Sequence, residues 1–119
     1  MINPVIDLWG HAMSSDIPDW CFSVSINQDI TYKHEDIDQL RYESPINFTL
    51  QITVPSLFLL GQDDKRVVPF QSIHMHKALK SQGTKTSLKL YPEESHEFTK
   101  PEQTIDSMVS TLDWIEQHF

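Results

Sequence analysis

The stretch VPSLFLLG, residues 54 to 61, constrains the fold more than any other part of the chain. An uninterrupted apolar run closed by a glycine is typical of a β-strand that is covered on both faces, as in a parallel sheet. The stretch that follows carries Pro69, which suits the first turn of a helix, and ends at Gly83, which readily takes the left-handed conformation found after a helix. These residues therefore predict a strand, a loop and a helix in that order.

A second strand and a second helix complete the pattern. TSLKLYP, residues 86 to 92, alternates leucines with polar residues, which predicts a strand near the edge of the sheet with one buried and one wet face. In the final helix Thr99 and Glu102 form a capping-box pattern, with Pro101 in the first turn. Apolar residues then share one helical stripe: Ile105, Met108, Val109, Leu112, Ile115 and Phe119. Strand, helix, strand, helix predicts an α/β fold with parallel strands and right-handed crossovers.

The first half of the chain carries less periodicity. Pro4, Pro18 and Pro45 interrupt it, SSDIPDW indicates a loop or a helix-flanking turn, and HEDIDQLRY, residues 34 to 42, favours a short helix. With 119 residues and 39% apolar content, we expect one globular domain.

Charge and composition exclude several classes of function. The net charge of −8, with nine scattered basic residues, argues against a nucleic-acid partner. Cys21 is the single cysteine and cannot form an internal disulfide. No apolar run approaches the roughly 20 residues of a membrane span, and no signal-peptide pattern opens the chain. We therefore expect a cytoplasmic protein without a membrane partner.

Two candidate site residues follow the two predicted strands. Asp64 lies in GQDDKRV after the first strand, and His96 lies in PEESHEF after the second. Functional groups in open α/β sheets sit beyond the carboxyl ends of the strands, where adjacent loops meet. Asp64 could then accept the Nδ1 proton of His96 and leave Nε2 free to act as a base. Spacing alone still favours ordinary turn residues, because such turns are rich in Asp and His.

Several blocks resemble a known family over nearly the whole chain. NPVIDL, DIPDWC, LLGQDDKRV and LYPEESHEF resemble the C-terminal end of the α/β-hydrolase domain of acylaminoacyl-peptidases, in the prolyl oligopeptidase family of serine peptidases. The resemblance implies Asp64 as the orienting acid, His96 as the general base and Arg66 as a ligand of the substrate's backbone. It implies a peptide substrate and no cofactor. This chain reads RVVP where that branch more usually reads RVP.

A nucleophile is absent from the pattern. An exposed serine needs the sharp turn of G-x-S-x-G, and no serine of this chain has a glycine two residues away on both sides. We therefore expect residues 1–119 to be a C-terminal piece of such a catalytic domain, lacking the nucleophile elbow and the oxyanion donors. A truncated product, an incomplete gene model and one piece of a split enzyme are all compatible with this. The isolated chain should be inactive, and it should self-associate or pair with the missing N-terminal portion.

Other conspicuous residues have simpler interpretations. His74 and His76 point to different faces of a helix and lack further ligands, so no metal is expected. Trp20, Cys21 and Phe22 either border the substrate pocket or, more simply, form core, with Cys21 an inert buried thiol.

The acidic residues near the two candidates are expected to be solvated. Asp63 indicates a turn, and Glu93, Glu94 and Glu97 indicate a wet acidic loop that would favour the imidazolium if ordered. A different class of function also stays open, a non-catalytic α/β module that acts by association. A flavodoxin-like domain is disfavoured, because the first half offers no phosphate-binding loop.

Overall fold

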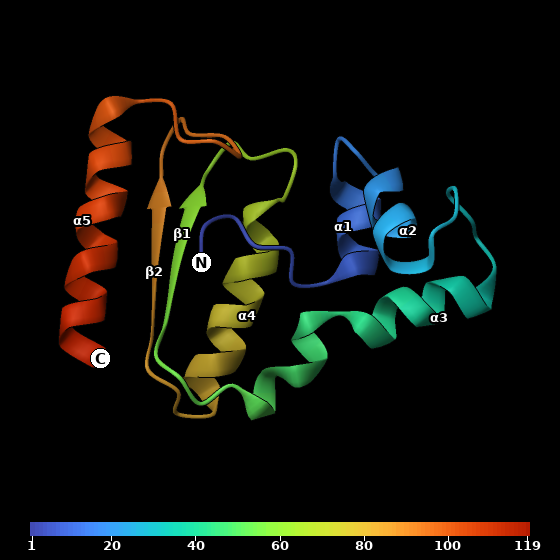
Figure 1. Ribbon diagram of the computed structural model, residues 1–119, viewed down its shortest axis with the longest axis horizontal. Helices are drawn as coiled ribbons and strands as arrows, with labels where there is room; N and C mark the ends of the chain where they lie inside the picture. Colours follow the sequence, from blue (N-terminus) through green and yellow to red (C-terminus); the bar gives the residue numbers. More distant parts are fainter.

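The structure is a computed structural model that describes residues 1–119. Its elements run in the order α1 (Leu8–Ser14), α2 (Asp19–Ile26), α3 (His34–Glu43), the 3-10 helix η1 (Pro45–Gln51), β1 (Ser56–Gly61), α4 (Pro69–Ser81), β2 (Thr86–Tyr91) and α5 (Pro101–His118). The two strands stand between α5 on one side and α4 on the other, and α1, α2 and α3 gather beyond α4 (Figure 1). The second half therefore has the predicted α/β order of strand, helix, strand, helix.

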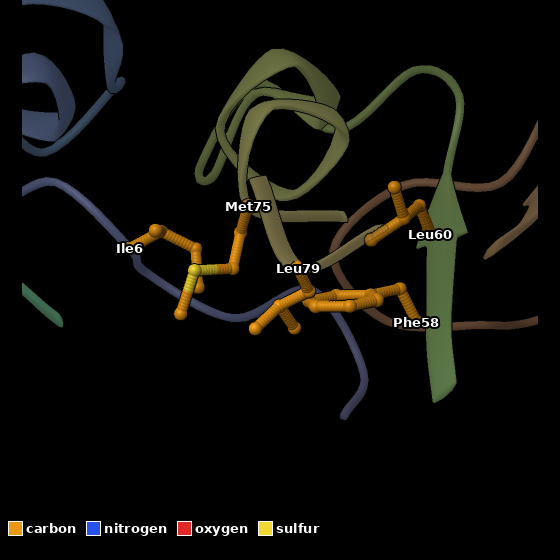
Figure 2. Packing of buried hydrophobic residues seen from close by; sticks show 5 residues of the cluster. All are labelled: Ile6, Phe58, Leu60, Met75 and Leu79. Atoms are coloured by element: carbon orange, nitrogen blue, oxygen red, sulfur yellow. The ribbon is translucent and has the colours of Figure 1, made fainter. Parts of the chain in front are cut away.

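The two strands form a parallel pair in which Ser56 lies opposite Thr86 and Gly61 opposite Tyr91. Phe58, Leu59 and Leu60 of β1 are at most 1% exposed, which confirms a strand covered on both faces. Phe58 and Leu60 alternate on one face and pack against α4, where Met75 and Leu79 lie one turn apart; Ile6 completes this cluster (Figure 2). Burial of these side chains anchors β1 to α4.

Strand β2 is an edge strand, because Ile2 lies beside β1 on its other side. Only part of the apolar face of β2 is buried. Leu88 packs against the core cluster, whereas Leu90 on the same face is exposed. The predicted alternation is therefore correct at Leu88 and wrong at Leu90, which is 39% exposed and does not reach the core cluster. Ahead of β2, Gly83 has a φ of +88° directly after α4, the left-handed conformation predicted for it.

The last helix, α5, carries its apolar stripe on an exposed face. The six residues Ile105, Met108, Val109, Leu112, Ile115 and Phe119, here called the α5 stripe, are between 49% and 78% exposed. The inner side of α5 is held by polar contacts instead, since the Tyr91 hydroxyl donates to Asp106 at 2.8 Å and Lys89 also pairs with Asp106. An amphipathic helix thus keeps its apolar side uncovered. None of the helices combines the length and the apolar composition that a membrane span requires.

The first half contains more helix than its sequence indicates. The expected helix over residues 34 to 42 is α3, and SSDIPDW forms the turn between α1 and the start of α2, as predicted. Helices α1 and α2 and the 3-10 helix were not expected. Helices α1 and α2 form because they and α3 pack on one another around a second core cluster, which consists of Ala12, Cys21, Phe22 and Leu40. The 3-10 helix packs against α4 instead.

Candidate active site

Asp64 lies in the loop after β1, and its carboxylate is hydrogen-bonded through both oxygens. Oδ1 accepts the main-chain N–H groups of Arg66 and Val67 at 2.8 and 2.9 Å. The side chain has no exposed surface. A buried carboxylate needs hydrogen bonds in place of water, and these two amides supply them while fixing the direction of Oδ2.

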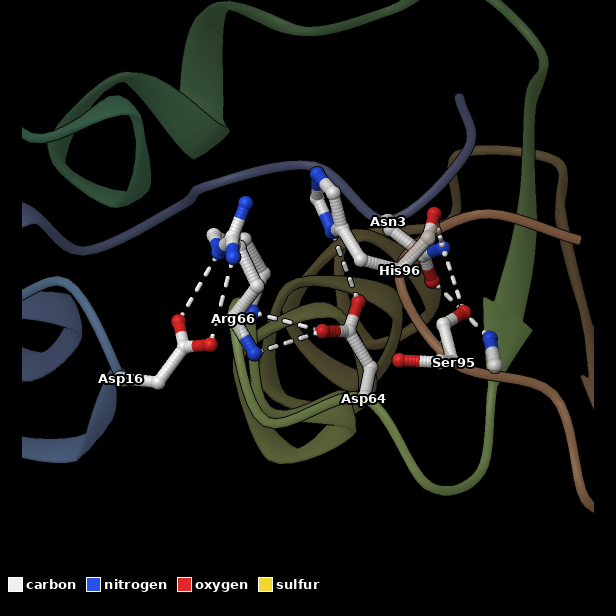
Figure 3. Close-up of polar contacts among 8 residues, drawn as sticks. Asn3, Asp16, Asp64, Arg66, Ser95 and His96 are labelled. Atoms are coloured by element: carbon white, nitrogen blue, oxygen red, sulfur yellow. Dashed lines mark hydrogen bonds and ion pairs between the residues drawn. The ribbon is translucent and has the colours of Figure 1, made fainter.

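His96 lies in the loop after β2, and its Nδ1 is 2.9 Å from Oδ2 of Asp64 (Figure 3). An ionised carboxylate can only accept, so Nδ1 is the donor in this contact and Nε2 is left free of it. Figure 3 shows the second ring nitrogen pointing away from Asp64. The expected hydrogen bond between the two residues is therefore present, with a geometry suited to a base and its orienting acid.

The strand register brings these two loops together. Just past the strands, the N–H of Gln62 donates to Tyr91 at 3.0 Å and the N–H of Asp63 donates to Glu94 at 2.9 Å. Gly61 makes this approach possible, because a Cβ there would stand 2.1 Å from the carbonyl oxygen of Ser95. The glycine that closes the apolar run is thus required by space, and its backbone does not need a positive φ.

His96 borders a polar hollow of about 690 Å³ that is lined by Asp16, Asp63, Lys65, Arg66, Ser95, His96, Glu97 and Thr99. Arg66 reaches this hollow, where Nε and one terminal nitrogen of its guanidinium bind Asp16 at 2.8 and 3.3 Å (Figure 3). This contact lowers the pKa of Asp16 and raises that of Arg66. The structure therefore places Arg66 in the same hollow as His96, with one edge of its guanidinium bound to Asp16. The sequence did not indicate this ion pair.

A smaller, partly apolar hollow of about 310 Å³ also borders His96, and the first half of the chain supplies most of its lining through residues such as Val5, Ile17 and Trp20. Trp20 lines this hollow and is 40% exposed. Cys21 and Phe22 are buried core instead. Burial raises the pKa of the Cys21 thiol to about 11, so the thiol stays protonated at neutral pH.

His11 also lines this smaller hollow, a position that the sequence did not indicate. His11 is 1% exposed, and its Nδ1 lies 3.2 Å from the Cys21 sulfur. Burial, with a further contribution from the charge of His96, lowers the pKa of His11. A neutral imidazole therefore sits behind the hollow, against the ring of Trp20 at a centroid distance of 5.5 Å.

The prediction of a wet acidic loop is wrong for Glu94. This residue is 0% exposed, and its carboxylate accepts the N–H groups of Thr99 and Lys100, each at 2.9 Å. The predicted capping box is wrong for the same reason, because α5 begins after Lys100 without a side-chain cap and Glu94 binds the amides just ahead of it. Glu94 thus binds the two amides just ahead of α5, and no side chain caps the first turn of the helix.

The neighbouring acidic residues differ from Glu94. Asp63, Glu93 and Glu97 are exposed, and Glu93 pairs with Lys100. His76 lies against the hydroxyl of Thr86 at 3.0 Å, and His74 packs beside Phe70. No three His, Cys, Asp or Glu side chains come together in a way that could hold a metal ion.

Comparison with known proteins bears on this arrangement of acid and base. The family model described as the prolyl oligopeptidase family matches residues 2–119. The chain belongs to the prolyl oligopeptidase family. Its relatives include the acylamino-acid-releasing enzymes of Rattus norvegicus and Homo sapiens, each 34% identical to it over 123 residues. These matches confirm the expected resemblance to acylaminoacyl-peptidases.

The chain is short beside these relatives. Each match covers 98% of this chain but 16% of the relative. Among solved structures, a puromycin-hydrolysing peptidase of Mycobacterium tuberculosis superposes with a TM-score of 0.83 at 20% identity, over 98% of this chain and 17% of that one. An acylaminoacyl peptidase of Pyrococcus horikoshii gives 0.81 at 18% identity, over 98% and 19%. These superpositions confirm the predicted fold as part of an α/β-hydrolase-type peptidase domain.

Proposed function

We propose that this chain supplies the general base and the orienting acid of a serine peptidase site that acts on N-acylated peptides. The hydrogen bond of 2.9 Å between Asp64 and His96, at the carboxyl ends of two adjacent parallel strands, is the observation that carries the proposal. Membership of the prolyl oligopeptidase family supports the reaction class. The relatives named acylamino-acid-releasing enzymes support an acylated peptide as the substrate.

Each residue has a stated role in this proposal. His96 takes the hydroxyl proton of a serine at Nε2 as the serine attacks the peptide carbonyl, and it returns that proton to the leaving amine. Asp64 keeps the proton on Nδ1 and stabilises the imidazolium that forms in between. Arg66 binds a carbonyl of the substrate's backbone with the edge of its guanidinium that Asp16 leaves free. The chemistry requires no cofactor.

The serine itself must come from elsewhere. No G-x-S-x-G occurs in the 119 residues, and a base without a positioned nucleophile and oxyanion donors lacks most of the rate enhancement. We infer that residues 1–119 act as a C-terminal piece of a catalytic domain and that the nucleophile belongs to a polypeptide segment that docks against them. The chain alone is then inactive.

The test combines the chain with such a segment. The purified chain is mixed with an acetyl-alanyl chromogenic substrate and a fluorophosphonate probe, alone and together with a separately expressed segment of a relative that carries the elbow. We expect turnover only in the mixture, and none with His96→Ala. Asp64→Asn should lower the rate by roughly 10⁴, since the imidazole then takes the wrong tautomer.

Two outcomes contradict the proposal. Turnover by the chain alone that His96→Ala abolishes, or stoichiometric serine labelling of the chain alone, would show that a nucleophile is present after all. Turnover in the mixture that survives His96→Ala would remove His96 from the mechanism.

A second function, association without catalysis, is favoured by the exposed α5 stripe. Five of its members, at positions 105, 108, 112, 115 and 119, alternate spacings of three and four residues, the pattern of a helix that packs along another helix. A monomer rarely exposes so continuous an apolar face. We infer that the stripe drives self-association of the chain, or pairing with the nucleophile-bearing segment.

Analytical ultracentrifugation tests this second function. Concentration-dependent association should weaken with Leu112→Glu in the stripe. Leu50→Glu is the matched control, because Leu50 is 85% exposed in the 3-10 helix, outside the stripe. A monodisperse monomer with a sharp, cooperative melting transition would refute self-association and favour a small self-sufficient domain.

We also propose a cellular compartment for the protein. Cys21 is the single cysteine and is a buried, protonated thiol, which suits a reducing compartment such as the cytoplasm. The basic residues are few and scattered, so we propose no nucleic-acid partner.

A further inference from the structure

Asn3 occupies an unusual position beside the end of β1. It is 5% exposed and has a φ of +41°, a conformation that asparagine adopts more readily than most residues. Its neighbour Ile2 pairs with Leu59 as a parallel bridge, and Pro4 follows. The backbone therefore runs beside β1 up to Asn3 and turns away at that residue.

The side chain of Asn3 makes the next hydrogen bond to β1 in place of its backbone. Along this edge, the N–H of Leu59 donates to Met1 at 2.9 Å and the N–H of Asn3 donates to Leu59 at 3.1 Å. The next bond of a regular parallel ladder would run from Gly61 to the main-chain carbonyl of Asn3. Gly61 instead donates to the side-chain Oδ1 of Asn3, at 2.9 Å.

The other end of the same carboxamide holds the loop of His96. Nδ2 donates to the carbonyl oxygen of His96 at 2.8 Å and to that of Ser95 at 3.4 Å (Figure 3). Neither carbonyl accepts any other hydrogen bond within the chain. Because a carboxamide has one acceptor and one donor group, like a peptide unit, it can join the end of β1 to this loop in a way that other side chains cannot.

We propose that Asn3 is a positioning residue for His96, which acts through the main chain while Asp64 acts through the ring. With two anchors the imidazole cannot pivot on the Asp64 contact, and Nε2 keeps one direction. This inference rests on the proposed function, since the direction of Nε2 matters only if His96 is a base. Gly61 takes part twice, by accommodating the loop and by binding Oδ1.

Asn3→Asp tests the donor alone. Aspartate also tolerates a positive φ, and its carboxylate can still accept from Gly61, but it presents an acceptor to the carbonyls of Ser95 and His96. Asn3→Ala removes both contacts. Leu40→Ala is the control, because Leu40 is fully buried in the other core cluster and its truncation destabilises the chain without contact with β1.

The readout is the hydrogen–deuterium exchange of the imidazole C2 hydrogen of His96, measured by mass spectrometry on a peptide that spans residues 88–100. His96 is the only histidine in that peptide, and the method does not require a monomer. Loss of one ordinary hydrogen bond raises the open population of a loop by about fivefold, so we expect exchange about fivefold faster in Asn3→Asp and faster still in Asn3→Ala. Nitrogen-15 shifts of the imidazole report the tautomer in parallel.

The outcomes separate this inference from the proposed function. If the unchanged chain shows no preference for the Nδ1–H tautomer, the pairing of Asp64 with His96 fails, and the proposed function fails with it. If that tautomer is present but Asn3→Asp leaves the exchange and tautomer of His96 as they were, the role of Asn3 is refuted. The role is also refuted if Leu40→Ala changes His96 as much as Asn3→Asp does.

Discussion

Replacement of Gly61 by alanine should break the candidate site and destabilise the chain together. A Cβ at residue 61 would lie 2.1 Å from the carbonyl oxygen of Ser95 and 2.7 Å from that of Glu94. Both are main-chain atoms, so neither can rotate away, and the loop must move by more than about 1 Å to reach ordinary contact. The loop that moves is the one that carries His96.

The magnitude follows from the contacts that the movement disturbs. Overpacking of a close contact costs about 1–3 kcal/mol. The displaced loop also loses the hydrogen bonds from Asp63 to Glu94 and from Asn3 to His96, each of which contributes about 1 kcal/mol. We expect Gly61→Ala to lower the free energy of unfolding by about 3–5 kcal/mol, a large share of the stability of an ordinary domain.

Gly83→Ala is the matched control, since Gly83 is constrained by conformation and not by space. Its φ is +88°, and an added Cβ would meet nothing within 4 Å. The cost of a left-handed alanine is about 1–2 kcal/mol, and His96 should be unaffected. Equilibrium urea unfolding, followed by tryptophan fluorescence and by circular dichroism, measures both variants. The reasoning is refuted if Gly61→Ala costs no more than Gly83→Ala, or if it folds with His96 still hydrogen-bonded to Asp64.

Two further predictions concern the buried polar groups. Glu94→Gln should lower the free energy of unfolding by about 2 kcal/mol, because an amide group replaces one of two carboxylate oxygens that accept from Thr99 and Lys100; equal urea midpoints for the two proteins would contradict this. The pKa of His11 is lowered in the folded chain, mainly by burial, so the unfolded chain binds more protons as pH falls below the ordinary value of about 6.5. Stability should therefore be full above that value and decline below it, and the decline should be smaller in His11→Gln when melting temperatures are compared between pH 7 and pH 5.

The second half of the fold could be predicted from the sequence because its signals are local. The apolar run of β1, a proline at the start of α4 and Gly83 after it each act through their own backbone or burial. Helices α1 and α2 have weaker signals, since they have seven and eight residues and bury two side chains each, and the N-cap Asp7 of α1 is a common residue in turns as well. Helices this short depend on tertiary packing, here on one another and on α3.

Part of the candidate site could likewise be predicted from the sequence, and part of it could not. Asp64 and His96 could be predicted because each follows a recognisable strand, and parallel neighbours bring such loops together. Glu94 could not, because a glutamate in an acidic stretch, with Glu93 beside it and Glu97 close by, is most often exposed, and only the fold reveals the two amides that it binds. Asn3 was beyond reach as well, since it lies 93 residues from His96 in sequence and its role depends on the register of residues 1–3 against β1.

The geometry of the acid and base depends on contacts that all lie within this chain. Two amides fix Asp64, Asp64 fixes the ring of His96, and Gly61 with Asn3 fixes the loop. The α5 stripe differs, because about half or more of each of its side chains is left exposed by the rest of the chain. A segment that docked on the stripe would therefore meet a His96 side chain that is already oriented, and the docking itself would not have to orient it. It follows that Leu112→Glu should weaken the apparent affinity for the nucleophile-bearing segment but leave the rate at saturation unchanged, whereas His96→Ala should abolish the rate and leave the affinity unchanged. A fall in the saturated rate with Leu112→Glu would show that docking also shapes the site.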